Sequence, residues 1–461
     1  MTDSGSLLRR APAAAEPAPN LYERFGLTQN PFPDKPSVVR GSEDRRLNGS
    51  IYWADLRERE ERDFERLLVP AADRADVGPM AFLMDYATRR GRGIGKTAFL
   101  GYQARRIMED LGEKLTGGAY VLFAAHILPS GEGRCRKFWQ FARLLMSELN
   151  EQRVIARAMW RLRAFSSCVP DTLLDAVGED VESTLGNDAW LEEQGINVDF
   201  NLVSVLRSTL IGAGVDGVIA EPLARWGHSP DLFEEAFLSR QTDYRWRRAG
   251  SSWVFDDLVR AFQAAEFSRG LLLVDEVEKI VVHQNSRERR MFVEDLRYCL
   301  MDGPYESARG GFYKMLLTIH PYVQELLAPH WAAAGMDRFC ALSGDLESKD
   351  TIYFRPLEYE LAVPLVREYL DESRLKPDER GRLDPFDQHA LIEALRLTGG
   401  VPGPMLALLR RVMQHAVEQG QESIGDDDVK RVFGREAPLE PEDTSEREPL
   451  PGPRVELRGD G

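Results

Sequence analysis

The 461-residue sequence predicts an α/β fold, with a parallel sheet layered between helices, a large helical insertion and an all-helical C-terminal domain. Three observations support this prediction. Short apolar runs that suit buried parallel strands alternate with helical periodicity between residues 80 and 320. One run leads through a glycine-rich segment into a helix, and a later run ends in two adjacent acids. From residue 357 to residue 433, apolar residues recur at the three- and four-residue steps of amphipathic helices.

The first strand is predicted at 80–86 and the following helix at 98–111. The segment between them ends in Arg90-Gly91-Arg92-Gly93-Ile94-Gly95-Lys96-Thr97. Between a strand and a helix, such glycines allow a tight turn whose backbone amides, with the helix N-terminus, face an anion. A turn that only caps a helix would explain the glycines, but not the Gly-Lys-Thr ending combined with acids downstream. The segment therefore predicts a phosphate-binding loop of a nucleotide site.

Each residue of this loop has an expected role. Lys96 would reach the outer phosphates, and the hydroxyl of Thr97 would ligate Mg²⁺. Arg90 occupies the first glycine position of the usual pattern, and Gly91 and Gly93 are expected to compensate for it. The nucleotide-binding residues are predicted to be Gly91, Gly93, Ile94, Gly95, Lys96 and Thr97.

A second apolar run, 271–274, ends in Asp275 and Glu276. Parallel sheets bind ligands at the carboxyl ends of their strands. Asp275 is predicted to hold Mg²⁺, and Glu276 to orient and polarise the attacking water, because phosphoryl transfer requires an in-line nucleophile. A solvated acidic pair would be the preferred interpretation only if the loop upstream were missing. Together, the two motifs predict an ATPase that uses ATP and Mg²⁺.

These motifs resemble those of the AAA+ P-loop ATPases, and in particular the bacterial branch of origin-recognition-like, ExeA-like and TniB- or TnsC-like proteins. The opening 22–32 is similar to that of ExeA-like chains. The run 312–321 resembles the fourth core strand, in which Thr318 or His320 would sense the γ-phosphate. Asp337-Arg338-Phe339 resembles the turn that supplies an arginine finger, so the resemblance implies that Arg338 completes the site of a neighbouring subunit in a homo-oligomer.

The helical lid of this family also has a counterpart. Gly399-Gly400-Val401-Pro402 resembles the Gly-x-Pro-Arg signature, but Gly403 stands where the family has its sensor arginine. Arg410 or Arg411, farther along the same helix, would have to substitute for it. The resemblance extends over about 20–435 and implies a three-layer AAA+ core followed by an all-α lid.

Five parts are predicted along the chain: a disordered arm (1–20), an N-terminal segment (21–70), the ATPase core (71–355), the lid (356–435) and a disordered tail (436–461). About 180 residues separate Lys96 from Asp275, more than short connections require, so a helical insertion is expected at about 150–255. We expect this insertion to bind a protein partner, because the core itself is committed to ATP. The N-terminal segment is predicted to contain a helix at 55–68, and the core a strand at 119–125 and a helix at 135–149.

Composition restricts the possible partners. The net charge of −16 excludes DNA binding through a global positive field, so any contact with DNA needs local patches. Candidate patches place arginines on one helix face or among aromatic residues: Arg153, Arg157, Arg161, Arg245, Arg247 and Arg248. A solvated helix face or an acid-pairing surface is the preferred interpretation of both patches, because acids outnumber bases 75 to 59. The four separated cysteines argue against a zinc site and a disulfide framework.

The sequence contains no apolar run of the ~18 residues that a membrane span needs, and its first twenty residues lack the apolar core of a signal peptide. We therefore expect a cytoplasmic protein without membrane contact. The resemblance implies an ATP-hydrolysing switch that oligomerises and acts on DNA or a DNA-bound partner in a mobile-element, defence or replication system. The alternative is a scaffold that binds ATP to fix a protein assembly and hydrolyses it slowly or not at all; Arg90 and Gly403 favour it. An ExeA-like role in secretion is a third hypothesis, disfavoured by the lack of an apolar span.

Overall fold

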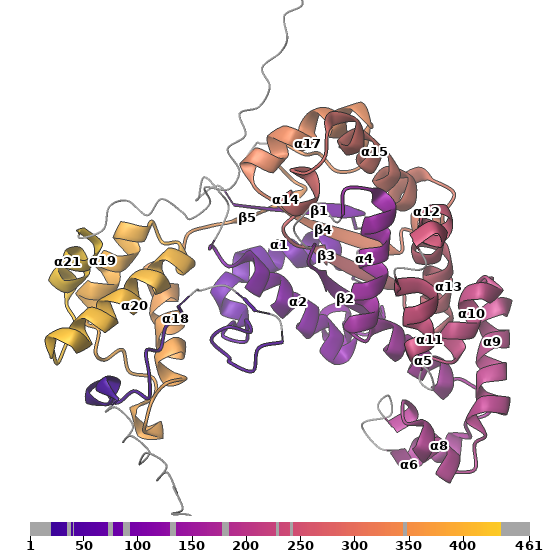
Figure 1. The fold of residues 1–461 in the computed structure, drawn as a ribbon, viewed down its shortest axis with the longest axis horizontal. Helices are drawn as coiled ribbons and strands as arrows, with labels where there is room; N and C mark the ends of the chain where they lie inside the picture. Colours follow the sequence, from indigo (N-terminus) through magenta and orange to yellow (C-terminus); the bar gives the residue numbers. More distant parts are fainter. Residues whose placement is uncertain are drawn as a thin grey trace, which may run out of the picture.

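The computed structural model describes residues 20–34, 38–39, 41–71, 77–85, 93–129, 135–177, 184–226, 230–239, 243–343 and 348–434 (Figure 1). The predicted tail, and the predicted arm apart from Asn20, lie outside these residues. Arg90 and Gly91 of the predicted phosphate loop also lie outside them.

Five parallel strands form one sheet in the order β2-β3-β4-β1-β5. The strands are β1 (Met80–Asp85), β2 (Leu122–Ile127), β3 (Arg269–Val274), β4 (Tyr313–Ile319) and β5 (Thr351–Phe354). The register pairs Met80 with Met315 and Phe82 with Thr351. All carboxyl ends therefore meet at one edge of the sheet, where open α/β sheets bind their ligands.

Helices cover both faces of the sheet, because alternate strand residues point to opposite sides. Ala81 and Leu83 of β1 pack in one cluster with helices α1 (Glu58–Leu68) and α2 (Lys96–Asp110). Phe82 and Met84 belong to the opposite cluster, which contains α4 (Phe138–Glu151), α15 (Ser286–Arg297) and α17 (Pro321–Ala333). The predicted α/β three-layer core is thus confirmed. The strand predicted at 119–125 begins later, at Leu122, and the helix predicted at 98–111 begins earlier, at Lys96.

Between β2 and β3, the described residues that follow α4 form helices, and they include most of the range of the predicted insertion. Their elements are α5 (Val154–Ala164), α6 (Asp171–Val177), α8 (Asp188–Glu193), η3 (Val198–Leu202), α9 (Val203–Gly212), α10 (Gly217–Ala224), α11 (Pro230–Phe233), η4 (Glu234–Leu238), α12 (Asp243–Ser252), η6 (Trp253–Asp257) and α13 (Leu258–Ala264). Their apolar side chains join the cluster on the α4 face of the sheet, so the insertion extends the core of the α/β layer.

Shorter elements complete the core. They are α3 (Glu113–Thr116), α14 (Glu278–Val281), η7 (Tyr298–Asp302), α16 (Glu306–Arg309) and η8 (Met336–Arg338). None of the helices in the described part of the chain is long and apolar enough to cross a membrane.

The C-terminal helices form a separate group with their own apolar core, at the left of Figure 1. They are α18 (Tyr359–Asp371), η9 (Pro377–Glu379), α19 (Gln388–Thr398), α20 (Pro402–Gln419) and α21 (Asp426–Gly434). We call this group the lid. Its core also includes Phe25, Leu27, Phe32 and Ile51 from the N-terminal segment, which carries η1 (Leu21–Phe25) and η2 (Ala54–Arg57).

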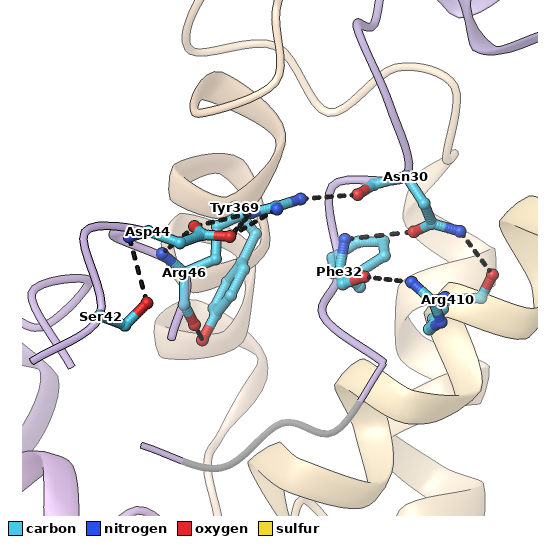
Figure 2. A network of polar contacts seen from close by, with 7 residues as sticks. All are labelled: Asn30, Phe32, Ser42, Asp44, Arg46, Tyr369 and Arg410. Carbon is cyan, nitrogen blue, oxygen red and sulfur yellow. Dashed lines mark hydrogen bonds and ion pairs between the residues drawn. The ribbon is translucent and has the colours of Figure 1, made fainter. Parts of the chain in front are cut away.

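The N-terminal segment is therefore divided between two cores. Its first part packs with the lid, whereas α1, near its end, packs on the sheet. Polar contacts fasten the first part to the lid (Figure 2). Arg410 of α20 donates to the carbonyl of Phe32 over 2.9 Å, and the side-chain amide of Asn30 donates to the carbonyl of Arg410 over 3.1 Å. Within the segment, Arg46 binds the carboxylate of Asp44 and donates to the carbonyl of Asn30. Sequence periodicity did not reveal this division, because it depends on packing between distant segments.

Candidate functional site

A pocket of about 460 Å³ lies at the carboxyl edge of the sheet, lined on one side by the core and on the other by the lid and the N-terminal segment. Most residues predicted for the nucleotide site line it: Gly93, Ile94, Gly95, Lys96, Thr97, Asp275, Glu276, Thr318 and His320. Residues far apart in the sequence thus meet in one concave site. Gly91 lies outside the described residues, and Arg338 is not among the lining residues.

The glycines of the loop adopt backbone conformations that other residues rarely take. Gly93 has φ +85° and Gly95, which caps α2, has φ +101°. Because α2 begins at Lys96, its N-terminal end faces the pocket, together with the positive end of the helix dipole. A helix N-terminus behind a glycine turn is suited to binding phosphate.

Lys96 lies beside an acid that the sequence analysis did not identify. Its Nζ atom is 3.9 Å from Oδ2 of Asp85, a fully buried residue at the end of β1. Burial lowers the pKa of Lys96, and the charges of Asp85 and Asp275 oppose this effect. The acid at the end of the apolar run 80–85 was the available signal, because strand ends meet at the ligand edge of the sheet.

Asp275 is the centre of a buried hydrogen-bonded cluster. The hydroxyl of Thr97 donates to its Oδ2 over 2.6 Å, and the hydroxyl of Thr318 donates to its Oδ1 over 2.8 Å. The backbone N–H of Glu276 donates both to Oδ1 of Asp275 and to the hydroxyl oxygen of Thr318. Burial would raise the pKa of Asp275, but the bond and charge of His126, with the bonds from both threonines, lower this pKa to about 2. Asp275 is therefore an anion at neutral pH.

His126 was also missed by the sequence analysis. It lies on β2, and its Nε2 is 3.5 Å from Oδ2 of Asp275. The side chain of Gln152 bonds to both the backbone N–H and the carbonyl of His126, which fixes this strand end. Only the pairing of β2 with β3 brings His126 beside the acids, so no local signal marked it.

Glu276 lines the pocket in an unusual conformation. Its φ is +46°, a region that costs a residue other than glycine roughly 1–3 kcal/mol. Its carboxylate forms an ion pair with the ammonium group of Lys279 on α14. Glu278, a third acid in the pocket, has a pKa raised by burial. The sequence predicted Glu276, but neither Glu278 nor the lysine partner.

Of the two other predicted catalytic residues, His320 lies in the pocket and Arg338 lies outside it. His320 lines the pocket and stacks on Tyr322 at a ring separation of 6.2 Å. Arg338 forms an ion pair with Asp302 over 2.5 Å and its side chain is 56% exposed. Its proposed action on a neighbouring subunit stays a prediction.

Gly403, at the position where the AAA+ resemblance implies an arginine, lies on the lid side of the pocket. Gly403 lines the pocket, whereas neither Arg410 nor Arg411 does. Arg410 is engaged elsewhere: it donates to the carbonyl of Phe32 (Figure 2). Its Nε also lies 3.2 Å from Oδ1 of Asp34. Arg410 is thus committed to joining the lid to the N-terminal segment.

The N-terminal segment contributes a further residue that the sequence analysis missed. Arg57 is buried, and its guanidinium donates to the carbonyl of Ile94 over 2.9 Å and to that of Arg355 over 2.5 Å. The guanidinium also lies over the ring of Phe354, 4.7 Å from its centroid. Arg57 therefore ties the phosphate loop to the end of β5.

The first arginine patch proposed for DNA makes contacts within the chain. Arg157 donates to the carbonyl of Met108, Arg161 donates to the carbonyl of Ala265, and Arg153 lies over the ring of Trp160. These contacts fasten α5 to its neighbours. They use hydrogen-bonding capacity that phosphates would require.

The second patch lies on α12 and includes Arg245, Arg247 and Arg248. Trp246 within it is fully buried and donates its indole N–H to the carbonyl of Phe237. Trp246 therefore cannot stack on bases, because packing against Trp253 takes it into the core. DNA binding by the arginines of both patches stays a prediction.

Comparisons with known proteins provide little further information. No family model matches the sequence, and no curated protein matches it. An ORC2 protein of Aeropyrum pernix, solved as ADPNP–ADP complexes, is similar with a TM-score of 0.38 and 11% identity, over 87% of this chain and 70% of that chain. The ADP form of the same protein is similar with a TM-score of 0.39 and 10% identity, over 86% of this chain and 70% of that chain. A Walker-type ATPase of Pyrococcus abyssi is similar with a TM-score of 0.35 and 14% identity, over 82% of this chain and 70% of that chain. These scores are too low to support a functional argument.

Proposed function

We propose that this chain is an AAA+ switch that binds ATP with Mg²⁺ in the pocket and hydrolyses it. The observation that carries the proposal is the buried cluster of Thr97, Asp275 and Thr318 beside Lys96, at the N-terminus of α2. It combines a cation and a helix terminus for phosphates with oxygen atoms for a hard metal ion. Nucleotide sites require this combination at one sheet edge.

The residues fit the two groups that they would bind. Lys96 and the loop Gly93-Ile94-Gly95 would hold the phosphates, and the apolar lid residues Leu365 and Leu406 would face the base. Thr97 and Asp275 offer the hydroxyl and carboxylate oxygens that Mg²⁺ prefers. When bound, Mg²⁺ would neutralise charge on the phosphate oxygens.

In hydrolysis, each of the other predicted site residues would have one role. Glu276 would orient the attacking water and accept its proton. Thr318 would fix both acids, because its hydroxyl contacts Asp275 and the backbone of Glu276, while His320 would approach the γ-phosphate. Arg338, exposed outside the pocket of its own chain, would act on the site of a neighbouring subunit in a homo-oligomer.

Action on DNA or on a DNA-bound partner is the further part of the proposal. Arg245, Arg247 and Arg248 on α12 are the preferred contacts, because Arg157 and Arg161 of α5 donate hydrogen bonds within the chain, whereas Arg245 and Arg247 lie over the rings of Trp253 and Trp139. The helical insertion, which carries α12, would dock the protein partner.

ATP binding and steady-state turnover, measured with and without duplex and single-stranded DNA, test the proposal. Wild-type protein should bind and hydrolyse ATP, and Glu276→Gln should bind ATP without hydrolysing it. Stimulation by DNA that disappears in an Arg245, Arg247 and Arg248 triple variant would support the DNA contact. Failure of wild-type protein to bind ATP in the presence of Mg²⁺ would reject the assignment.

A second candidate function is a scaffold that uses ATP to fix an assembly and hydrolyses it slowly or not at all. The ion pair between Glu276 and Lys279 favours it, because the carboxylate is held by a cation instead of being free to accept a proton. Turnover far below ~1 s⁻¹, combined with ATP-dependent association in light scattering, would select this function. Faster turnover that Glu276→Gln abolishes would select the first.

A further inference from the structure

The lid meets the phosphate loop through a contact between two glycines. The backbone N–H of Gly403, near the start of α20, donates to the carbonyl of Gly93 over 2.8 Å. A Cβ atom on Gly403 would lie 3.0 Å from both the Cα and the carbonyl oxygen of Gly93. A Cβ atom on Gly93 would lie 3.1 Å from Cδ of Pro404. Side chains are therefore excluded from both partners unless the helix moves away.

The start of α20 is itself fixed to the connection that leaves the sheet. The N–H of Leu357 donates to the carbonyl of Gly400 over 2.8 Å. Gly400 has φ +71°, and a Cβ atom there would lie 2.7 Å from the carbonyl oxygen of Leu357. A displacement of the lid about this connection would therefore be transmitted to Gly403.

The next carbonyl of the loop, that of Ile94, accepts a hydrogen bond from the N-terminal segment. Ile94 accepts the guanidinium bond of Arg57, so two consecutive loop carbonyls are bonded, one to the lid and one to the N-terminal segment. Lys96 and Thr97 follow within three residues of Ile94. A change in the path of the backbone at Gly93 would shift both side chains, because the intervening chain is short.

We infer that the lid controls nucleotide binding through this contact, by setting the backbone of the phosphate loop. This inference rests on the proposed function. The lid residues that line the described part of the pocket carry no charge: Leu357, Leu365, Tyr369, Pro402, Gly403 and Leu406. The lid therefore acts on the phosphates through the position of the loop, in place of the arginine that the AAA+ resemblance implies for position 403.

Substitutions at Gly403 test this positioning role. Gly403→Ala should weaken ATP binding by about tenfold or more, because the added methyl group separates the lid from the loop. The effect should appear in Kd more than in kcat at saturating ATP, since the acids are untouched. Gly212→Ala is the matched control, because Gly212 ends α9 with open space around its missing Cβ, and it should change Kd by less than about twofold.

Gly403→Arg separates this inference from a direct role of a lid arginine. If the lid acts through the loop backbone, this variant should bind ATP no better than Gly403→Ala. The inference would be overturned if Gly403→Arg hydrolysed ATP faster than wild type. It would also be overturned if Gly403→Ala bound ATP as tightly as wild type. If wild-type protein binds no ATP, the proposed function itself fails, and this inference fails with it.

Hydrogen exchange of wild-type protein provides a second test that does not depend on how the variants fold. ATP should slow exchange at residues 93–97 and at the amide of Gly403 together, because one hydrogen bond joins them. Slower exchange confined to 93–97 would overturn the inference.

Discussion

The two walls of the pocket are built in different ways. On the wall formed by the sheet edge, the side chains of Lys96, Thr97, Asp275 and Thr318 come from strand ends and one helix N-terminus. On the wall formed by the lid and the N-terminal segment, Arg57 and Gly403 bind backbone carbonyls of the loop. The first wall therefore carries the acids, the lysine and the hydroxyls, whereas the second, which also includes Arg45 and Arg46, sets the loop that presents them. Substitutions on the two walls should accordingly differ in the size and kind of their effects.

The largest expected effect is on the sheet-edge wall. Lys96→Ala should reduce ATP affinity by about 100-fold or more, because it removes a cation whose side chain is only 12% exposed from the phosphate site. Isothermal titration calorimetry measures the change. Lys114→Ala, at a lysine whose side chain is 87% exposed, is the control and should leave affinity unchanged. If Lys96→Ala bound ATP as tightly as wild type, the sheet-edge wall would not be the one that binds the phosphates.

A smaller effect is expected from the opposite wall at Arg57. Arg57→Met should weaken ATP binding by about tenfold, because each bond to a charged group contributes about 1.5–3 kcal/mol and only the loop position is lost. Arg57→Lys should recover part of the affinity by restoring one donor. Arg59→Met, at an exposed arginine on α1, is the control. A loss as large as that of Lys96→Ala would show that Arg57 contacts the nucleotide directly.

The ion pair of Glu276 gives a prediction of opposite sign. Lys279→Met should raise turnover by about threefold, because the carboxylate is freed to accept a proton from water while the cost of breaking a partly exposed ion pair is small. Steady-state phosphate release measures it, with Lys349→Met as control. Lower turnover in Lys279→Met would mean that Lys279 supports the reaction, and would remove the observation that favours the slow scaffold.

The smallest effect concerns stability behind the pocket, where Glu61 of α1 lies close to Tyr52 and Arg106. Burial raises the pKa of Glu61 to about 7 from an ordinary value of 4.5, although Arg106 opposes the shift. The folded protein thus binds more protons than the unfolded chain between these values, so this contribution to stability is present below pH 4.5 and is lost as pH rises through 7.

Glu61→Gln removes this titration. Its Tm should equal that of wild type near pH 4.5 and exceed it by on the order of 2 °C at pH 8, as measured by calorimetry. Glu58→Gln, at an exposed acid on the same helix, is the control. A Tm difference that does not change with pH would exclude a raised pKa at Glu61.

The sequence by itself determined the α/β fold and most of the sheet-edge wall. The loop that ends in Lys96 and Thr97 is contiguous in sequence, so its phosphate-binding role can be predicted without knowledge of the fold. Asp275 and Glu276 follow an apolar strand, and the carboxyl ends of parallel strands share one edge whatever the strand order. Local pattern and the geometry of parallel sheets were sufficient for these residues.

Only the tertiary structure decided the rest. His126 reaches Asp275 because β2 pairs with β3, and Arg57 reaches Ile94 because the N-terminal segment passes between the sheet and the lid. Trp246 is buried because Trp253 and Phe237 pack around it, although its sequence neighbours are charged. Gly403 faces Gly93 because the connection after β5 fixes the start of α20. Each of these contacts joins segments distant in sequence, and their proximity depends on how separate cores pack, which no local periodicity encodes.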